Sequence, residues 1–282
     1  MKHPDFKLYF AVFSHGRPNS VKEVTKYMGT DCTWYVGKGE RRAYEKAGAR
    51  RVVDSGNLPV SRNVALDDAW RIGCTCVQVS DDLRRFSLAT SRMVPLTALS
   101  AAMLVSASLD ACQGVYLGGG TSTSNPYMAI GLRTGNKLPL HPRPIVQFDT
   151  LVLGDFSVVK PCGLYFDENT PVKEDYEYTL RHLLVYGKVL RLNYLLQDFR
   201  HRTNPGGANL ERWGPEKTER RSYDYLLNRW GKVLSTVIKR GPTSSDLEIR
   251  INWRNKEQVE TWPIIHPRFP RLRYPRIAYE IT

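Results

Sequence analysis

The chain has 282 residues, of which 41% are hydrophobic, 11% aromatic and 24% charged. This composition is that of a folded globular protein, with one large domain or one domain and a modest appendage. It excludes a disordered tail, a fibrous repeat and a disulfide-dense scaffold. The 41 Lys and Arg against 28 Asp and Glu give a net charge of +13, which favours an anionic partner such as a nucleic acid.

Neither the cysteines nor the apolar segments indicate export or a membrane. The five cysteines lack the spacing of a disulfide framework or a zinc site, so we expect reduced thiols, as in a cytoplasmic protein. The segment Met1–Phe13 has no signal-peptide cleavage site. The most apolar later stretch, Val94–Leu109, is too short and too rich in serine to span a bilayer. We therefore expect a cytoplasmic protein without a membrane segment.

Residues 8–80 alternate between short apolar strands and short helices. The continuous apolar run Leu8–Phe13 predicts a strand that is buried on both faces. Pro18 suits the first turn of a helix that runs to about Met28. This alternation predicts βαβ units, and thus a parallel sheet flanked by helices. The other predicted elements are strands at Thr33–Val36, Arg51–Asp54 and Thr75–Val79, and helices at Glu40–Ala47 and at Arg62–Ile72 with Ser61 as N-cap.

The rest of the chain gives less regular patterns. The stretch Val94–Leu109 predicts a buried helix, and the glycines and serines of Gly118–Asn125 predict a flexible loop. We divide the chain into an α/β domain over residues 1–210 and a basic extension over residues 211–282, packed on the same domain. The remaining predictions are strands over Ile145–Leu153 and Val189–Leu196, helices over Glu174–Val185 and Arg220–Lys239, and a strand-like or irregular basic C-terminus.

Two adjacent carboxylates follow the fourth predicted strand. Asp81 and Asp82 come after Thr75–Val79 and Ser80, and open α/β sheets bind ligands at the carboxyl ends of their strands. Two carboxylates in this position suit a hard divalent cation that keeps coordination positions open for phosphate oxygens. The alternative is a helix cap or a solvated turn. The buried strand before the pair favours the metal site.

A second acidic cluster opens the helix predicted from Glu174. Carboxylates in a first helical turn are stabilised by the helix dipole, so ordinary helix-start chemistry is one explanation. The functional alternative is that one carboxylate faces the site as a general base. Asp175 is the better candidate, because Glu174 and Glu177 share the opposite side of the turn.

Polar residues after the first strand are candidates for nucleotide contacts. Arg17 could pair with a diphosphate through its planar guanidinium, with Ser14 and His15 beside it. His15 is alternatively a simple turn residue. Further along, His201 lies in a polar stretch and is either a surface histidine or a third metal ligand.

Together these segments resemble a glycosyltransferase of the GT-A architecture, and more narrowly the TET/JBP-associated glycosyltransferases. That group includes the base J glucosyltransferase and phage relatives that glycosylate hydroxymethylated pyrimidines in DNA. The resemblance covers roughly Leu8–Gly207 and implies a Rossmann-like α/β fold with a mostly parallel central sheet. It is carried by SHGRP, SRNVALDDAW, VQVSDDL and FDENTPVKEDYEYTLRHLLVYGKVLRLNYLLQDFRHRTNPGG.

The resemblance implies specific roles for these residues. Asp81 and Asp82 would bind Mn²⁺ or Mg²⁺ and the diphosphate of a nucleotide sugar, UDP-glucose first among the candidates. Ser80 stands where relatives often carry a third aspartate, which leaves two carboxylates for the metal. The implied site comprises Ser14, His15, Arg17, Arg62 and Asp81 at the donor, Asp82 and His201 at the metal, and Glu174 and Asp175 as the acid pair near the acceptor.

The expected acceptor is hydroxymethylated DNA, and the expected transfer inverts the sugar's anomeric carbon. Arg202, Arg271 and Arg273 would follow the phosphate backbone, although a basic tail wrapped around the domain is equally compatible. Gly119 and Gly120 would help to wall a pocket for a flipped base. Two other functions stay open: a GT-A enzyme with a polysaccharide or protein acceptor, and a non-catalytic nucleic-acid-binding protein. The sugar, the modified base and the oligomeric state stay undetermined.

Overall fold

The structure is a computed structural model that describes residues 6–89, 93–122, 145–200, 218–231, 233–238 and 247–253. The described strands are β1 (Leu8–Ser14), β2 (Thr33–Val36), β3 (Val52–Asp54), β4 (Thr75–Ser80), β5 (Leu83–Ala89), β6 (Met93–Leu96), β7 (Leu117–Ser122), β8 (Val146–Gln147), β9 (Phe156–Val159), β10 (Leu190–Phe199), β11 (Leu234–Ile238) and β12 (Leu247–Ile251). The described helices are α1 (Ser20–Met28), α2 (Arg41–Lys46), α3 (Leu58–Arg71), α4 (Ala98–Ala111), α6 (Glu174–Tyr186) and α8 (Thr218–Trp230).

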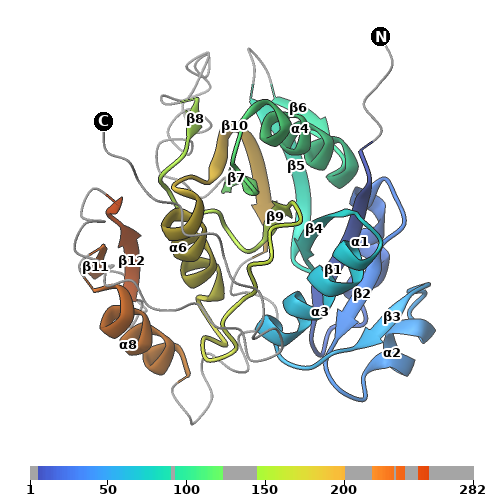
Figure 1. Cartoon of the computed structure of the whole chain (residues 1–282). Helices are drawn as coiled ribbons and strands as arrows, with labels where there is room; N and C mark the ends of the chain where they lie inside the picture. The colour runs from blue at the N-terminus through green and yellow to red at the C-terminus, as the bar shows by residue number, and fades with distance from the viewer. Residues whose placement is uncertain are drawn as a thin grey trace.

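A large mixed sheet organises these elements in the order β3-β2-β1-β4-β9-β7-β10-β5-β6 (Figure 1). β1 pairs in parallel with β2 and β4, and β2 with β3. β9 then runs antiparallel to β4 and β7, and β10 runs parallel to β7 but antiparallel to β5. The predicted α/β fold is confirmed and is compatible with a Rossmann-like fold, but the sheet is wholly parallel only among β1 to β4.

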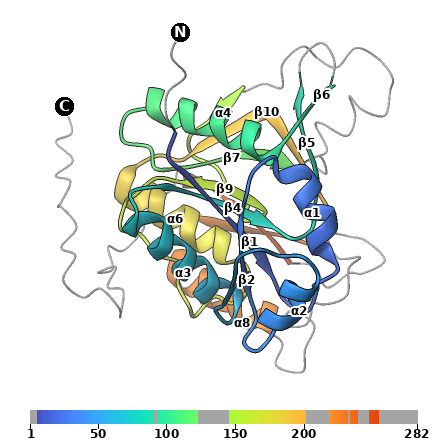
Figure 2. The same cartoon turned by 90° about the vertical axis from the view of Figure 1, so that its right-hand side faces the viewer.

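The side chains of β1 divide the core between the two faces of the sheet. Phe10 and Val12 belong to a cluster that α1 and α4 cover, whereas Ala11 and Phe13 belong to a cluster that α3 and α6 cover. This alternation follows from the period of two along a strand. Figure 2 shows α4 on one side of the sheet and α3 with α6 on the other. Because both faces are covered, the strand must be apolar throughout, as predicted.

Helix α3 begins earlier than the sequence pattern predicts. Its N-cap is Asn57, whose side chain accepts a hydrogen bond from the Val60 amide at 3.3 Å, and Pro59 lies in the first turn. Ser61, the predicted cap, is buried inside the helix and donates to the Gly56 carbonyl. The prediction was wrong because asparagine and proline supply a complete helix start one turn earlier.

The predicted helix over Val94–Leu109 is a strand followed by a helix. β6 takes the first part of this stretch, and Thr97 then caps α4 by accepting from the Ser100 amide at 3.1 Å. Apolar content alone does not distinguish a buried strand from a buried helix, so one apolar run covered both. The capping threonine marks the boundary between them.

Gly119 and Gly120 lie in β7 inside the sheet, so the flexible-loop prediction is wrong for them. A Cβ on Gly120 would lie 2.5 Å from the Leu195 carbonyl oxygen, and one on Gly119 would lie 2.9 Å from that of Phe156. These glycines let the backbones of β10 and β9 approach closely. Since both residues are buried between strands, they do not wall an acceptor pocket.

Further elements also differ from the prediction. The strand expected over Ile145–Leu153 is reduced to β8, and neither β5 nor β9 was anticipated. The helix expected over Arg220–Lys239 ends at Trp230 and gives way to β11, which pairs antiparallel with β12. α8 and this hairpin pack into the cluster that α3 and α6 cover, through Tyr223, Leu226 and Trp253 among others.

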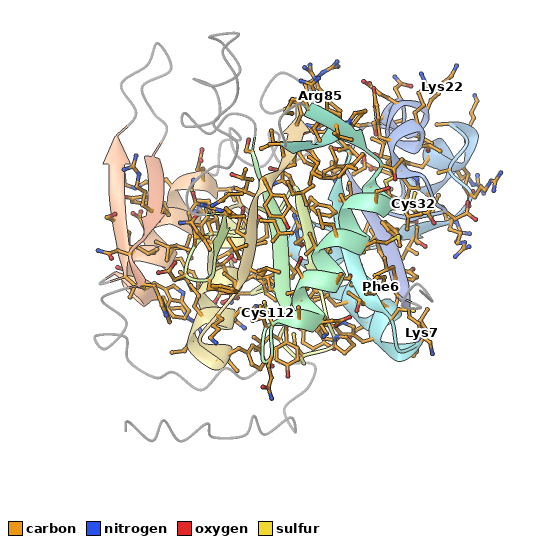
Figure 3. The ribbon with its side chains drawn as sticks, turned by 90° about the horizontal axis from the view of Figure 1, so that it is seen from above. Phe6, Lys7, Lys22, Cys32, Arg85 and Cys112 are labelled. Carbon is orange, nitrogen blue, oxygen red and sulfur yellow. The ribbon has the colours of Figure 1, made fainter. Side chains whose placement is uncertain are left out.

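All five cysteines are free, as expected, and Figure 3 shows two of them, Cys32 and Cys112, on different parts of the molecule. Across the described ranges, no helix has the length and apolar character needed to cross a bilayer.

Candidate functional site

The carboxyl ends of β1 and β4 bring Arg17 to the two aspartates. Asp81 is tied to β1 by its amide, which donates to the Phe13 carbonyl at 3.2 Å. One Arg17 nitrogen, Nη1, donates to Asp81 Oδ1 at 2.9 Å and to Asp82 Oδ1 at 2.6 Å. The two carboxylates therefore converge on a single position, which the Arg17 guanidinium occupies.

Two hydroxyl groups, those of Ser14 and Tyr44, form a hydrogen-bonded chain that ends on Asp81. Ser14 Oγ donates to Asp81 Oδ2, and it is hydrogen-bonded to the Tyr44 hydroxyl at 2.5 Å. That hydroxyl also accepts from the Arg17 amide at 3.0 Å. Burial, with the neighbouring Asp82 charge, raises the pKa of Asp81 to about 7 against the opposing effect of Arg17. Tyr44 was not predicted, because nothing in a short helix distant in sequence marks it as part of this site.

His15 lies beside Glu40 and Gly37. Its Nε2 lies 3.6 Å from Glu40 Oε1, and its ring lies so close to Gly37 that a Cβ there would be 2.6 Å from Nδ1. Glu40 also accepts from the Gly16 amide at 3.0 Å. Among the described residues, His15 is thus placed beside the turn between β2 and α2 at the edge of the site.

Arg62 is buried beneath the second acidic cluster. Its Nε donates to Glu174 Oε1 at 3.1 Å, Nη1 to Gln78 Oε1 at 2.7 Å and Nη2 to the Gly154 carbonyl at 2.8 Å. The guanidinium also lies 5.0 Å from the ring centroid of Phe13. All three nitrogens are engaged by protein groups, so Arg62 holds α3, β4 and the start of α6 together, and its predicted donor contact stays a prediction.

The two predicted acids of α6 have different surroundings. Glu174 is 5% exposed, and burial raises its pKa to about 7 although Arg62 opposes the shift. Asp175 is half-buried; its Oδ2 accepts from the Gly154 amide at 3.1 Å and its Oδ1 from the Tyr176 amide at 3.0 Å. Of the two acids, Asp175 is the more exposed, and both of its oxygens accept from backbone amides.

Gly154 and Asp155 join the two acidic clusters. The Asp155 carbonyl accepts a hydrogen bond at 2.8 Å from the amide of Ser80, which is the residue before Asp81. Next to it, a Cβ on Gly154 would lie 2.8 Å from Arg62 Nη2 and 3.2 Å from Asp175 Cβ. The missing side chain at Gly154 lets α6 start against this segment. The sequence pattern gave no signal for this bridge, because it depends on the unpredicted strand β9.

The residue before the acid pair is strained and ion-paired. Lys173 has φ 64°, the only positive φ outside glycine among the described residues, and residues held in this region cluster at functional sites. Its Nζ lies 3.2 Å from Oε1 of Glu219 at the start of α8. The two side chains are 11% and 14% exposed. α8 therefore contacts the turn that positions Asp175.

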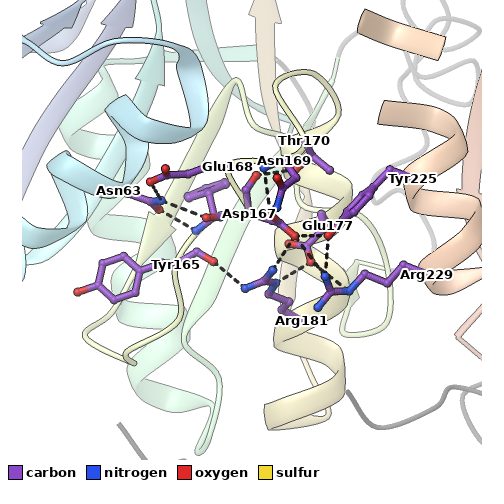
Figure 4. Close-up of polar contacts among 11 residues, drawn as sticks. Asn63, Tyr165, Asp167, Glu168, Asn169, Thr170, Glu177, Arg181, Tyr225 and Arg229 are labelled. Carbon is purple, nitrogen blue, oxygen red and sulfur yellow. Dashed lines mark hydrogen bonds and ion pairs between the residues drawn. The ribbon is translucent and has the colours of Figure 1, made fainter. Parts of the chain in front are cut away.

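A buried polar network ties α8 to the middle of α6 (Figure 4). Arg181 donates to Glu177 at 2.6 Å and to Asp167 at 3.0 Å. From α8, Tyr225 and Arg229 donate to the same Asp167 carboxylate, at 2.6 Å and 3.2 Å. Two carboxylates and two guanidinium groups balance in charge, which is what a buried ionic cluster requires.

His201, Arg202, Arg271 and Arg273 lie outside the described residues, so their predicted roles stay predictions. The described chain runs up to Arg200, whose amide donates to the Asp82 carbonyl at 2.9 Å. Within the described part, no group of three or more His, Cys, Asp or Glu side chains could hold a metal ion. A divalent cation that keeps water and phosphate ligands needs only one or two carboxylates.

Comparison with known proteins adds no assignment: no family model and no curated protein matches the chain.

Proposed function

We propose that the chain is a metal-dependent glycosyltransferase of the GT-A type. It moves a sugar, glucose from UDP-glucose being the first candidate, onto the hydroxymethyl group of a modified pyrimidine in DNA. The observation that carries this proposal is that one short segment, residues 154–155, connects two acidic pairs, Asp81 with Asp82 and Glu174 with Asp175. Ser80 and Asp175 are hydrogen-bonded to consecutive residues, Asp155 and Gly154.

The two aspartates fit Mn²⁺ or Mg²⁺. Both direct an oxygen at one Arg17 nitrogen, so a single cationic centre satisfies both carboxylates. Asp81 and Asp82 would hold the metal, which supplies charge neutralisation at the leaving diphosphate when bound. Arg17 would exchange its carboxylate partners for diphosphate oxygens, which match its planar guanidinium.

Asp175 is the base in this proposal. It takes the proton of the substrate hydroxyl while the oxygen attacks C1 of the sugar and the bond from C1 to the diphosphate breaks. Attack from the face opposite the leaving group inverts the anomeric carbon. Glu174, buried on Arg62, fixes the start of α6 and takes no proton from the substrate.

DNA is the proposed acceptor because of the net charge of +13 and the resemblance described above.

The test is the mass of nucleosides from hydroxymethylated DNA after incubation with the protein, Mn²⁺ and a panel of nucleotide sugars. We expect a gain of one sugar that EDTA abolishes. Metal-dependent hydrolysis of the donor without any gain on DNA would move the acceptor to a saccharide or a protein. If the protein showed neither turnover nor metal-dependent nucleotide binding, the result would favour the alternative function, a non-catalytic nucleic-acid-binding protein.

A further inference from the structure

A β-bulge exposes two consecutive arginines at the start of β5. In the ladder with β10, Leu83 pairs with Phe199 and Arg85 pairs with Asp198, so Arg84 is an extra residue. Neighbouring strand residues normally point to opposite faces of a sheet, but here Arg84 and Arg85 are both exposed. Bulges are frequent beside active sites, where they redirect side chains.

These arginines follow the metal-site aspartates directly. Asp82 and Arg84 are separated only by Leu83. The Asp82 carbonyl accepts a hydrogen bond from the amide of Arg200, so a third cationic residue lies at this end of the β5–β10 ladder. Arg84 has no ion pair with any residue in the described part of the chain. Arg85 lies 3.2 Å from Asp198, yet its side chain stays 62% exposed and lies at the outer edge of the molecule in Figure 3.

We propose that Arg84 and Arg85 form a phosphate-binding edge that holds the backbone of the acceptor DNA beside the site. The inference depends on the proposed function for the identity of the acceptor. Two aspartates at the site repel a polyanion, so an acceptor that reaches Asp175 needs cations close by. The donor diphosphate is a second source of phosphate. We assign the pair to DNA because Arg17 already lies on the aspartates, whereas Arg85 points outward.

The chain supplies a matched control pair. Arg50 and Arg51 are also consecutive, exposed (83% and 62% at the side chain) and ion-paired, both with Asp31. They precede β3, which is an edge strand of the sheet and is separated from β5 by six strands. The double variants Arg84→Ala/Arg85→Ala and Arg50→Ala/Arg51→Ala therefore remove the same charge from two different places.

The test is the affinity of the full chain for an unmodified DNA duplex over a series of salt concentrations, without metal or sugar nucleotide. Each phosphate contact contributes about 0.9 to the slope of log affinity against log salt. In the Arg84/Arg85 variant we expect the magnitude of that slope to fall by about 1 to 2. Its affinity for DNA at 0.1 M salt should fall on the order of tenfold. The Arg50/Arg51 variant should keep both near the wild-type values. Binding of UDP with Mn²⁺ should be unchanged in both variants.

Three results would overturn the inference: equal losses in both variants, a loss of UDP binding with DNA binding intact, or no DNA binding by the wild-type chain. The test also separates this inference from the proposed function. A weakened duplex affinity in a protein that transfers no sugar supports the phosphate-binding edge and rejects the transferase. Sugar transfer with unchanged duplex affinity supports the transferase and rejects the edge.

Discussion

Arg17 and Arg62 illustrate two uses of a guanidinium group within one site. Arg17, 11% exposed at the side chain, bridges two carboxylates that a metal would also engage, and its guanidinium group matches the oxygens of a diphosphate. Arg62, 4% exposed, binds one carboxylate, one amide oxygen and one backbone carbonyl. The first arrangement can exchange partners with a ligand. The second can only hold the surrounding elements in place, and its loss should act on stability.

Replacement of Arg62 with methionine should leave the Glu174 carboxylate buried without a cation. At pH 8 we expect the free energy of unfolding to fall by about 3 kcal/mol, the range found when one partner of a buried ion pair is removed. Denaturant unfolding measures this value. The double variant Arg62→Met/Glu174→Gln should recover most of it. A single variant within about 0.5 kcal/mol of wild type would contradict the buried pairing.

The pKa of Glu174 also predicts how stability depends on pH. Burial raises this pKa from 4.5 to about 7 in the folded state, so the folded chain binds more protons than the unfolded chain between these values. The contribution of Glu174 to stability should therefore decrease as the pH rises from about 4.5 to 7. Unfolding of wild type and Glu174→Gln across this range measures it. If the two curves stay parallel, Glu174 does not titrate in this way.

Among the elements, β7 and α8 matter most for the site. β7 is an interior strand in spite of its three consecutive glycines, because those glycines allow close contact with β9 and β10. α8 contacts α6 at two places, through the pair Lys173–Glu219 and through the Asp167 network. Both elements act on the geometry of α6 and the sheet without supplying a side chain to the two acidic pairs.

Substitution of Gly120 with alanine should destabilise the fold by about 1–3 kcal/mol, because the added Cβ meets the fixed Leu195 backbone. Gly118→Ala is the matched control: its Cβ would meet only side-chain atoms of Val105 and Leu109, which can adjust. We expect a smaller loss there. Thermal unfolding of both variants measures these losses. A Gly120→Ala variant with the melting temperature of the wild type would indicate that Gly120 lies in a loop and not in an interior strand.

Glu219→Gln should loosen the turn before α6 while the fold stays intact. We expect kcat for sugar transfer to fall roughly three- to tenfold, the KM for the donor to stay constant, and hydrogen exchange in the first turn of α6 to accelerate. Asp224→Asn is the control, since Asp224 forms an exposed ion pair with Arg220 on the same helix. Equal effects of the two variants on exchange would contradict a specific role for Glu219.

At the scale of the whole molecule, the parallel half of the sheet follows from the sequence and the mixed half does not. β1 to β4 are apolar strands between helices of ordinary length, so local pattern suffices. β5 contains two exposed arginines at a bulge, and β7 contains three consecutive glycines. Both compositions are unusual for a strand, and each is explained by the neighbouring strand with which it pairs or packs. Whether β5 and β7 form strands is decided by their pairing across the sheet, which the hydrophobic periodicity of the sequence does not predict.

The candidate site divides in the same way. Asp81, Asp82 and Arg17 were predictable, because the ends of neighbouring parallel strands meet at one edge. The contact of Arg62 with Glu174 spans 112 positions of sequence and needs β9 to place Gly154 between them. No local pattern contains that information.

The central claim is that the two acidic pairs serve one reaction. The most direct test measures sugar transfer to hydroxymethylated DNA, by nucleoside mass, in Asp82→Asn, Asp175→Asn and the control Asp110→Asn, whose carboxylate is exposed and pairs with Lys160. We predict that the first two variants each lose at least about a hundredfold in rate, with an inverted anomeric carbon in the wild-type product, and that the control stays active. Transfer by Asp175→Asn near the wild-type rate, or a retained configuration, would contradict the account.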